Sequence, residues 1–222
     1  MNYNRKDFIK TAGILSSGIA FSAFISNDSH LFDAKKIKKF ALQLYSLRDD
    51  LPKDPKAVLK QVAAFGYKQI ESYEGKQGMF WGMTAMEFKK YMKELDMNII
   101  SSHCNINKDF EKKAADAAAI GMKYLICPYL GPQKSLDEYK MKAEDFNKKG
   151  EICKKNGIRF AYHNHDYSFA TVEGQIPQDV MLENTNPDLV DFEMDIYWVV
   201  TAGVDPVAYA KKYKNRFRLG HE

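Results

Sequence analysis

The chain has 222 residues, of which 45% are hydrophobic and 28% charged, with a formal net charge of +4. This composition is ordinary for a globular protein and excludes a chain that is disordered throughout. The small positive charge is spread along helical, lysine-containing stretches, which argues against a nucleic-acid groove. The three cysteines show no CxxC spacing, so neither a disulfide framework nor a zinc knuckle is indicated.

The first 30 residues have the character of a bacterial export signal. Residues 4–10, Asn-Arg-Lys-Asp-Phe-Ile-Lys, are similar to the twin-arginine translocation motif, with Lys6 in place of the second arginine. The apolar stretch from Thr11 to Ile25 is short and rich in Ser and Gly for a membrane span. No cysteine is available there for a lipid anchor. We therefore expect export to the periplasm without a stable membrane anchor.

From Lys38 onward, short apolar runs alternate with amphipathic stretches. They recur at roughly the spacing of a strand followed by a helix. The predicted strands cover residues 40–45, 68–73, 98–103, 124–128, 159–163, 189–195 and 217–221. The predicted helices cover residues 55–65, 84–95, 110–120, 136–155, 178–183 and 206–213.

Three of the helix-to-strand junctions carry a glycine, at Gly66, Gly121 and Gly157, which suits the left-handed turn that ends a helix. Repeated strand–helix steps favour one parallel sheet, and we predict an α/β fold, a (β/α)8 TIM barrel over residues 38–222. A doubly wound open sheet is the alternative, although no phosphate-cradling glycine loop follows the first strand. Because a barrel has eight strands, we expect this one to be truncated after the seventh.

Three segments place polar side chains at the C-terminal ends of predicted strands. His163 and His165 follow the fifth strand, Glu193 and Asp195 end the sixth, and His221 ends the seventh. Residues two apart on a strand share a face, so each pair points to the same side. A mixed site of imidazoles and carboxylates suits Zn²⁺ or Mn²⁺, and an open coordination position would accept a sugar oxygen.

These strand-end residues, with the Tyr162-His163-Asn164-His165 and Leu219-Gly220-His221 segments, resemble the xylose isomerase-like TIM-barrel superfamily of sugar phosphate isomerases and epimerases. The resemblance implies an active site at the C-terminal mouth of the barrel and a bound Mn²⁺, Mg²⁺, Co²⁺ or Zn²⁺. It assigns Asp195 and His221 as metal ligands. His163 stands where many members have a glutamate, which makes it the third expected ligand and favours nitrogen-preferring metals.

Other polar residues at strand ends are candidates for catalysis and substrate binding. Glu71 is a candidate general base, His103 a candidate acid or substrate ligand, and His165 a third candidate catalytic residue. The candidate substrate-binding residues are Trp198, Arg48 and Asn164.

The resemblance implies an isomerase or epimerase that removes a proton next to a metal-polarised carbonyl of a sugar or sugar-derived polyol. A lyase that dehydrates a keto-inositol or cleaves a keto-glycoside starts with the same step and is the first alternative. A phosphodiester hydrolase on the same barrel would need more histidines than the five present. A sugar-binding barrel without catalytic activity is a further alternative. A small-molecule sugar is the expected partner, and a homo-oligomer is compatible with the resemblance.

Overall fold

The computed structural model describes residues 40–222. The export signal predicted over residues 1–30 lies outside these residues and stays a prediction. No helix within the described residues has the length and apolar character needed to cross a membrane.

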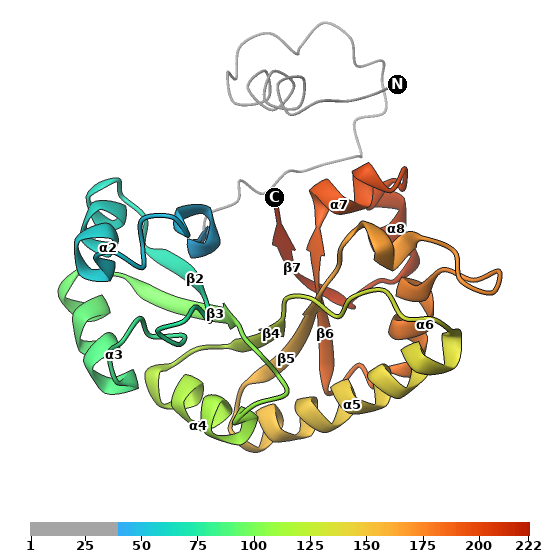
Figure 1. The fold of residues 1–222 in the computed structure, drawn as a ribbon, viewed down its shortest axis with the longest axis horizontal. Coiled ribbons are helices and arrows are strands. Elements are labelled where there is room, and N and C mark those ends of the chain that lie inside the picture. Colours follow the sequence, from blue (N-terminus) through green and yellow to red (C-terminus); the bar gives the residue numbers. More distant parts are fainter. Residues whose placement is uncertain (1–39) are drawn as a thin grey trace, which may run out of the picture. The chain divides into compact units, whose positions relative to one another are not determined.

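The seven strands are all parallel and are paired in chain order. Within residues 40–222 the sheet curls into a half-barrel, and the helices that connect the strands lie on its outer side (Figure 1). A doubly wound sheet would break the sequential strand order, so the predicted TIM-barrel class is confirmed, with seven of its strands present. The strands are β1 (Leu42–Gln43), β2 (Gln69–Tyr73), β3 (Asn98–His103), β4 (Tyr124–Cys127), β5 (Arg159–His163), β6 (Val190–Asp195) and β7 (Phe217–His221).

Five of the seven α-helices in residues 40–222 follow a residue whose side chain accepts a hydrogen bond from a first-turn amide. Asp54, Thr84, Ser135 and Asp205 each cap a helix in this way. The helices are α2 (Pro55–Ala64), α3 (Ala85–Glu94), α4 (Phe110–Ile120), α5 (Leu136–Lys155), α6 (Pro177–Asn184), α7 (Ile196–Thr201) and α8 (Pro206–Lys212), with single 3-10 turns η1 (Leu44–Leu47) and η2 (Asp166–Phe169).

The predicted glycine junctions are confirmed. Gly66, Gly121 and Gly157 have φ angles of +91°, +92° and +75°. A side chain would strain the backbone there, so each glycine allows a helix to end and the chain to turn into the next strand.

Among the strands and α-helices of residues 40–222, two differ from the sequence prediction by more than one residue at an end. The first strand has only two residues, because Gln43 accepts a hydrogen bond from the Tyr45 amide and the chain turns into η1. Helix α7 was not predicted, because its residues Ile-Tyr-Trp-Val-Val-Thr are β-branched or aromatic and favour strands. Asp195 starts this helix by capping the Trp198 amide at 3.0 Å.

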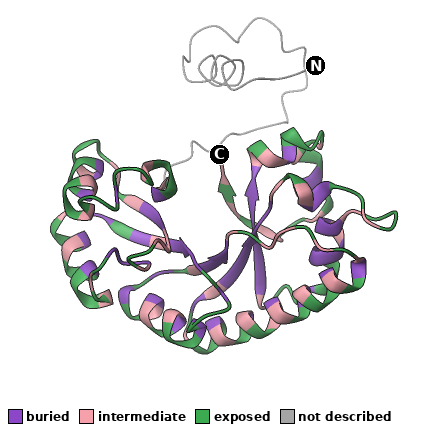
Figure 2. Cartoon of the chain, in the orientation of Figure 1, coloured by how far each residue is buried: buried purple, intermediate pink, exposed green. Residues whose placement is uncertain are grey.

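Alternation along the strands separates the core from the site. In β5, Phe160 and Tyr162 face the outer layer, where the Phe146 ring of α5 lies 5.2 Å and 5.3 Å from theirs. His163 shares the other face, which lines the inside of the half-barrel. Figure 2 shows that the central strands are buried along most of their length. The aromatic side chains therefore pack the helices against the outer face of the sheet, and polar site residues such as His163 lie on its inner face.

Candidate metal centre

His163, Asp195 and His221 come together at the C-terminal ends of three adjacent strands. Each offers one ligand atom, and these atoms lie within 4.8 Å of one another. His163 Nε2 lies 3.1 Å from Asp195 Oδ2, and Asp195 is the register partner of His221. The parallel pairing of β5, β6 and β7 therefore builds this histidine–aspartate group from the three residues that the sequence predicts as metal ligands.

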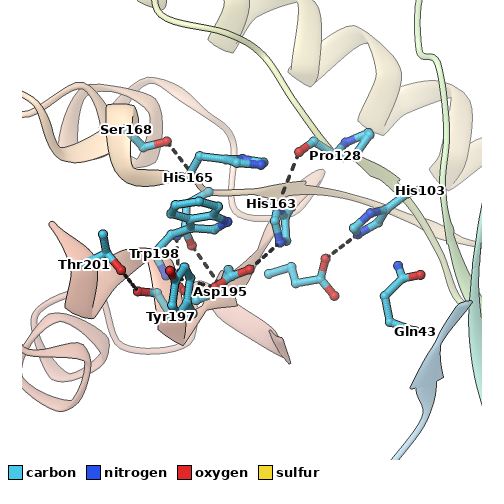
Figure 3. A network of polar contacts seen from close by, with 12 residues as sticks. Gln43, His103, Pro128, His163, His165, Ser168, Asp195, Tyr197, Trp198 and Thr201 are labelled. Carbon is cyan, nitrogen blue, oxygen red and sulfur yellow. Dashed lines mark hydrogen bonds and ion pairs between the residues drawn. The ribbon is translucent and has the colours of Figure 1, made fainter. Parts of the chain in front are cut away.

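The Asp195 carboxylate is held on both sides. Its Oδ1 accepts the Trp198 amide, while its Oδ2 faces His163 (Figure 3). Burial alone would raise the pKa of Asp195, but the hydrogen bonds from His163 and from the Trp198 amide lower it below its usual value. Asp195 is therefore ionised at neutral pH, as a metal ligand must be.

A second group, formed by Glu71, His103 and Glu193, shares His221 with the first, and its ligand atoms also lie within 4.8 Å of one another. His103 Nε2 is 2.8 Å from Glu193 Oε2 and 3.3 Å from Glu71 Oε1. Burial and the nearby charge of Glu71 raise the pKa of Glu193 well above its usual value. Burial lowers the pKa of His103, although Glu71 and Asp195 act in the opposite direction. Burial therefore favours the neutral form of the His103 imidazole and the protonated form of the Glu193 carboxyl group.

Two hydrogen bonds orient the Glu71 carboxylate. Gln43 Nε2 donates to its Oε1 at 2.8 Å, and the Ser101 hydroxyl donates to its Oε2 at 2.5 Å. Gln43 and Ser101 are the register partners of Glu71 on the strands to either side. Neighbouring strands therefore fix this carboxylate without any loop residue.

His165 lies between two aromatic rings. The Tyr167 ring stacks on it at a centroid distance of 5.6 Å, and the Trp198 ring stacks at the same distance. Burial, and then the charge of His163, lowers the pKa of His165 to about 4. Its Nδ1 is buried and makes no hydrogen bond within the described residues. At neutral pH this imidazole is uncharged.

A cavity of about 740 Å³ opens over the two groups. Its lining includes six of the predicted site residues, namely His103, His163, His165, Asp195, Trp198 and His221. Other parts of the wall carry aromatic rings, asparagine amides and one further carboxylate, from Tyr45, Tyr73, Tyr129, Asn105, Asn107 and Glu74.

Three predicted site residues do not line this cavity. Glu71 is buried below it, in contact with His103. Asn164 is fully buried and uses both ends of its amide on the backbone of Asp195. Arg48 is exposed, and its guanidinium donates to the Tyr45 carbonyl at 3.1 Å.

Sequence reasoning did not single out Gln43, Tyr129 or Asn105. Gln43 could have been found as the last residue of the first strand, on the face that carries Glu71 in the next strand. Tyr129 and Asn105 follow the ends of β4 and β3, where the loops of this fold surround the active site. Nothing in their immediate sequence distinguishes them from ordinary loop residues.

The chemistry of the donor set fits a divalent cation. The histidine–aspartate group offers two imidazoles and one ionised carboxylate on the floor of a cavity, which leaves a coordination position open for a substrate. Nitrogen and oxygen ligands in this mixture suit Zn²⁺, Mn²⁺ or Co²⁺. Asn164, Trp198 and the Pro128 carbonyl, which lies 3.3 Å from His163 Nδ1, supply the outer contacts that orient such ligands.

Comparisons with known proteins agree with this arrangement. The crystal structure of a sugar phosphate isomerase/epimerase from Parabacteroides distasonis ATCC 8503 superimposes on this chain with a TM-score of 0.75. The two chains are 33% identical, and the match covers 83% of this chain and 78% of the other. The crystal structure of IOLI protein with a bound zinc atom superimposes with a TM-score of 0.66 at 13% identity, which shows a shared fold.

Among curated proteins, an inosose dehydratase from Clostridium tetani is 32% identical over 85 residues. That match covers 38% of this chain and spans only 28% of the length of the dehydratase. No family model matches the chain. The extent and identity of the Parabacteroides match carry the assignment, and the chain belongs to the sugar phosphate isomerase/epimerase family of xylose isomerase-like TIM barrels.

Proposed function

We propose that the protein is a divalent-metal-dependent isomerase or epimerase that acts on a sugar or a sugar-derived polyol. One observation carries the proposal: His163, Asp195 and His221 converge within 4.8 Å on the floor of a cavity that His103 also lines. The family membership and the zinc atom in the IOLI protein support it.

The histidine–aspartate group would hold the metal through His163, Asp195 and His221. A divalent cation there would polarise a carbonyl or hydroxyl oxygen of the sugar and so acidify the adjacent C–H bond. Asp195 is ionised and fixed by its neighbours, so little rearrangement would be needed for binding.

His103 is the residue best placed to move the proton. It lines the cavity, its Nε2 faces Glu193 and Glu71, and its Nδ1 makes no hydrogen bond within residues 40–222. The lowered pKa keeps the imidazole neutral, so it can accept a proton at one nitrogen while the carboxyl groups act on the other. Glu71 is buried next to His103, and its carboxylate would accept the Nε2 proton when the imidazole takes a proton from the substrate at Nδ1.

Trp198 and His165 would position the sugar. Both line the cavity, and their stacked rings present a wall beside Asp195 (Figure 3). The neutral His165 would donate or accept a hydrogen bond to a sugar hydroxyl, and it would leave proton transfer to His103.

A lyase is the second candidate. The inosose dehydratase similarity favours it, although that match spans a small part of the dehydratase. Dehydration of a keto-sugar also begins with proton removal next to a carbonyl, so the same residues would serve both reactions.

The motif in residues 4–10 supports a periplasmic location for this activity. Fractionation of cells that express the full chain, with Arg5→Lys as the variant, tests it. Retention of that variant in the cytoplasm is the expected result, and equal export of both forms would contradict the twin-arginine route.

The test of the function is hydrogen exchange. The Mn²⁺-loaded protein is incubated with keto-sugars in D₂O, and NMR follows deuterium incorporation at the carbon next to the carbonyl. Exchange with formation of an epimer or isomer supports the proposal, whereas loss of water or of an aglycone identifies the lyase. Exchange should disappear in His103→Gln with metal binding retained. Sugar binding without any exchange would contradict catalysis and indicate a sugar-binding barrel.

A further inference from the structure

We infer that this cavity takes an uncharged carbohydrate and discriminates against its phosphate esters. The inference rests on the proposed function for the identity of the site, and it goes further by excluding the charged members of the substrate class.

None of the described residues that line the cavity is a lysine or an arginine. Proteins recognise phosphate groups mainly through charge-assisted hydrogen bonds from these two side chains. The lining instead carries the carboxylates of Glu74 and Asp195. Apart from the divalent cation proposed at His163, Asp195 and His221, a phosphate dianion that entered would find no cationic group among the described lining side chains.

Two cations contact lining residues through their side chains, and both are already engaged. Lys108, which follows the lining residue Asn107, is exposed and does not line the cavity. The Arg48 guanidinium lies 5.0 Å above the Tyr45 ring and donates to the Tyr45 carbonyl. The Lys113 ammonium lies 2.7 Å from the Glu74 carboxylate and 2.8 Å from the Asn105 carbonyl, with only 12% of its side chain exposed. Neither group can reach a ligand without losing these partners.

A free helix N-terminus is the other common phosphate ligand. Helix α7 brings Trp198 of its first turn to the cavity, but the Asp195 carboxylate already accepts the Trp198 amide. The N-terminus of α5 is capped by Ser135. Helices α5 and α7 therefore offer the cavity no uncapped N-terminus. Helix α4, which follows the lining residues Asn105 and Asn107, has no side-chain cap, but Asp109 and Glu111 lie at its start and their charge opposes that of a phosphate.

The walls suit a neutral sugar. Tyr45, Tyr73, Tyr129 and Trp198 present rings on which the apolar face of a sugar can pack. Asn105 Oδ1 accepts the Asn107 amide at 2.9 Å, which leaves its Nδ2 to donate to a hydroxyl. Side-chain amides both donate and accept, which matches a hydroxyl group better than a phosphate.

The Glu74–Lys113 ion pair fixes the amide-bearing part of the cavity wall and also engages the nearby lysine charge. Glu74 Oε2 accepts the Asn105 amide at 2.7 Å while Lys113 binds the Asn105 carbonyl, so the pair fixes the loop that carries Asn105 and Asn107. The same contacts keep the Lys113 charge away from a ligand. Glu74 is thus a positioning residue that also sets charge selectivity.

Isothermal titration calorimetry on the Mn²⁺-loaded full chain tests the inference. The probes are matched pairs, D-fructose, D-psicose and D-tagatose against their 6-phosphates. The expected result is that at least one free sugar binds at least about tenfold tighter than its ester. Tighter binding of any ester than of its free sugar would overturn the inference, as would the absence of binding by all three free sugars. Binding is read without turnover, so an inactive protein that prefers free sugars would refute the proposed function alone.

A charge variant makes the test specific. Glu74→Gln removes the partner of Lys113 and should raise the affinity for the esters several-fold, with no gain for the free sugars. Glu144→Gln on the exposed surface of α5 makes the same change in net charge and is the matched control. An equal gain in both variants, or no gain in Glu74→Gln, would contradict the role assigned to the Glu74–Lys113 pair.

Discussion

The side chain of Asn164 and the backbone of Asp195 exchange two hydrogen bonds across the β5–β6 boundary. Asn164 Nδ2 donates to the Asp195 carbonyl at 3.2 Å, and the Asp195 amide donates to Asn164 Oδ1 at 3.1 Å. Both residues are buried. The position of the Asp195 carboxylate is therefore fixed from the neighbouring strand end, next to His163.

Replacement of Asn164 should damage both stability and metal binding. Asn164→Ala removes both hydrogen bonds and leaves the buried Asp195 amide without its side-chain acceptor, which costs about 1–3 kcal/mol. Loss of a residue that orients a metal ligand lowers metal affinity by about 10–100-fold. Urea denaturation of the metal-free protein and calorimetric titration with Zn²⁺ measure the two effects separately.

Asn156→Ala is the control for this prediction. Asn156 follows α5 and donates one hydrogen bond to the Ile152 carbonyl at 2.9 Å; it precedes β5, whose opposite end carries the site. Its loss should reduce stability by about 1 kcal/mol and leave the affinity for Zn²⁺ unchanged. Equal metal affinity in Asn164→Ala and Asn156→Ala would contradict the positioning role.

Glu193→Gln should change the pH dependence of stability. The raised pKa means that folded Glu193 binds its proton more tightly than the unfolded chain does. The metal-free protein should therefore lose stability as the pH rises from the ordinary carboxyl pKa through the raised value. The uncharged glutamine removes this loss, so the variant should gain on the wild type with increasing pH.

Thermal unfolding of the metal-free proteins across this pH range measures the difference. Glu94→Gln, at an exposed position of α3, serves as the control and should follow the wild type. A Glu193→Gln curve parallel to that of the wild type would show that the buried carboxyl has an ordinary pKa.

Gly150→Ala tests how α5 packs on the sheet. A Cβ at this position would lie 2.7 Å from both the Leu189 Cβ and the Leu189 carbonyl oxygen, just before β6. Alanine normally stabilises a helix relative to glycine, but here the clash should dominate and cost about 1–3 kcal/mol. Urea denaturation checks this, with Lys148→Ala on the exposed side of α5 expected to be close to neutral. A stabilised Gly150→Ala variant would mean that α5 and Leu189 are not in contact.

Much of the fold was predictable because each strand–helix step carries its own local signals. The strands β3, β5 and β7 and the helices α4 and α5 have the predicted bounds, since clear apolar runs and end residues define them. Helix α7 could not be predicted from propensity. Its first turn depends on Asp195, whose carboxylate also belongs to the site.

The residue types of the candidate site were predictable from the sequence. Which of those residues line the cavity and which are buried behind it was less predictable. The strand-end positions of His163, Asp195 and His221, together with the family resemblance, were enough to group them as candidate ligands, and the three lie together in the structure. Strand-end position could not show that Glu71 lies below His103 while Asn164 lies behind Asp195, because curvature of the sheet decides which polar side chains reach the cavity. The stacking of His165 on Trp198 likewise depends on a helix that the sequence did not reveal.

Metal content is the measurement that tests the central claim most directly. Elemental analysis and titration calorimetry are applied to the wild-type chain and to His163→Ala, Asp195→Ala and His165→Ala. We predict a stoichiometric divalent ion in the wild type, its loss in His163→Ala and Asp195→Ala, and its retention in His165→Ala. A wild-type chain that binds no divalent ion, or an Asp195→Ala variant that binds it as tightly as the wild type, would contradict the account.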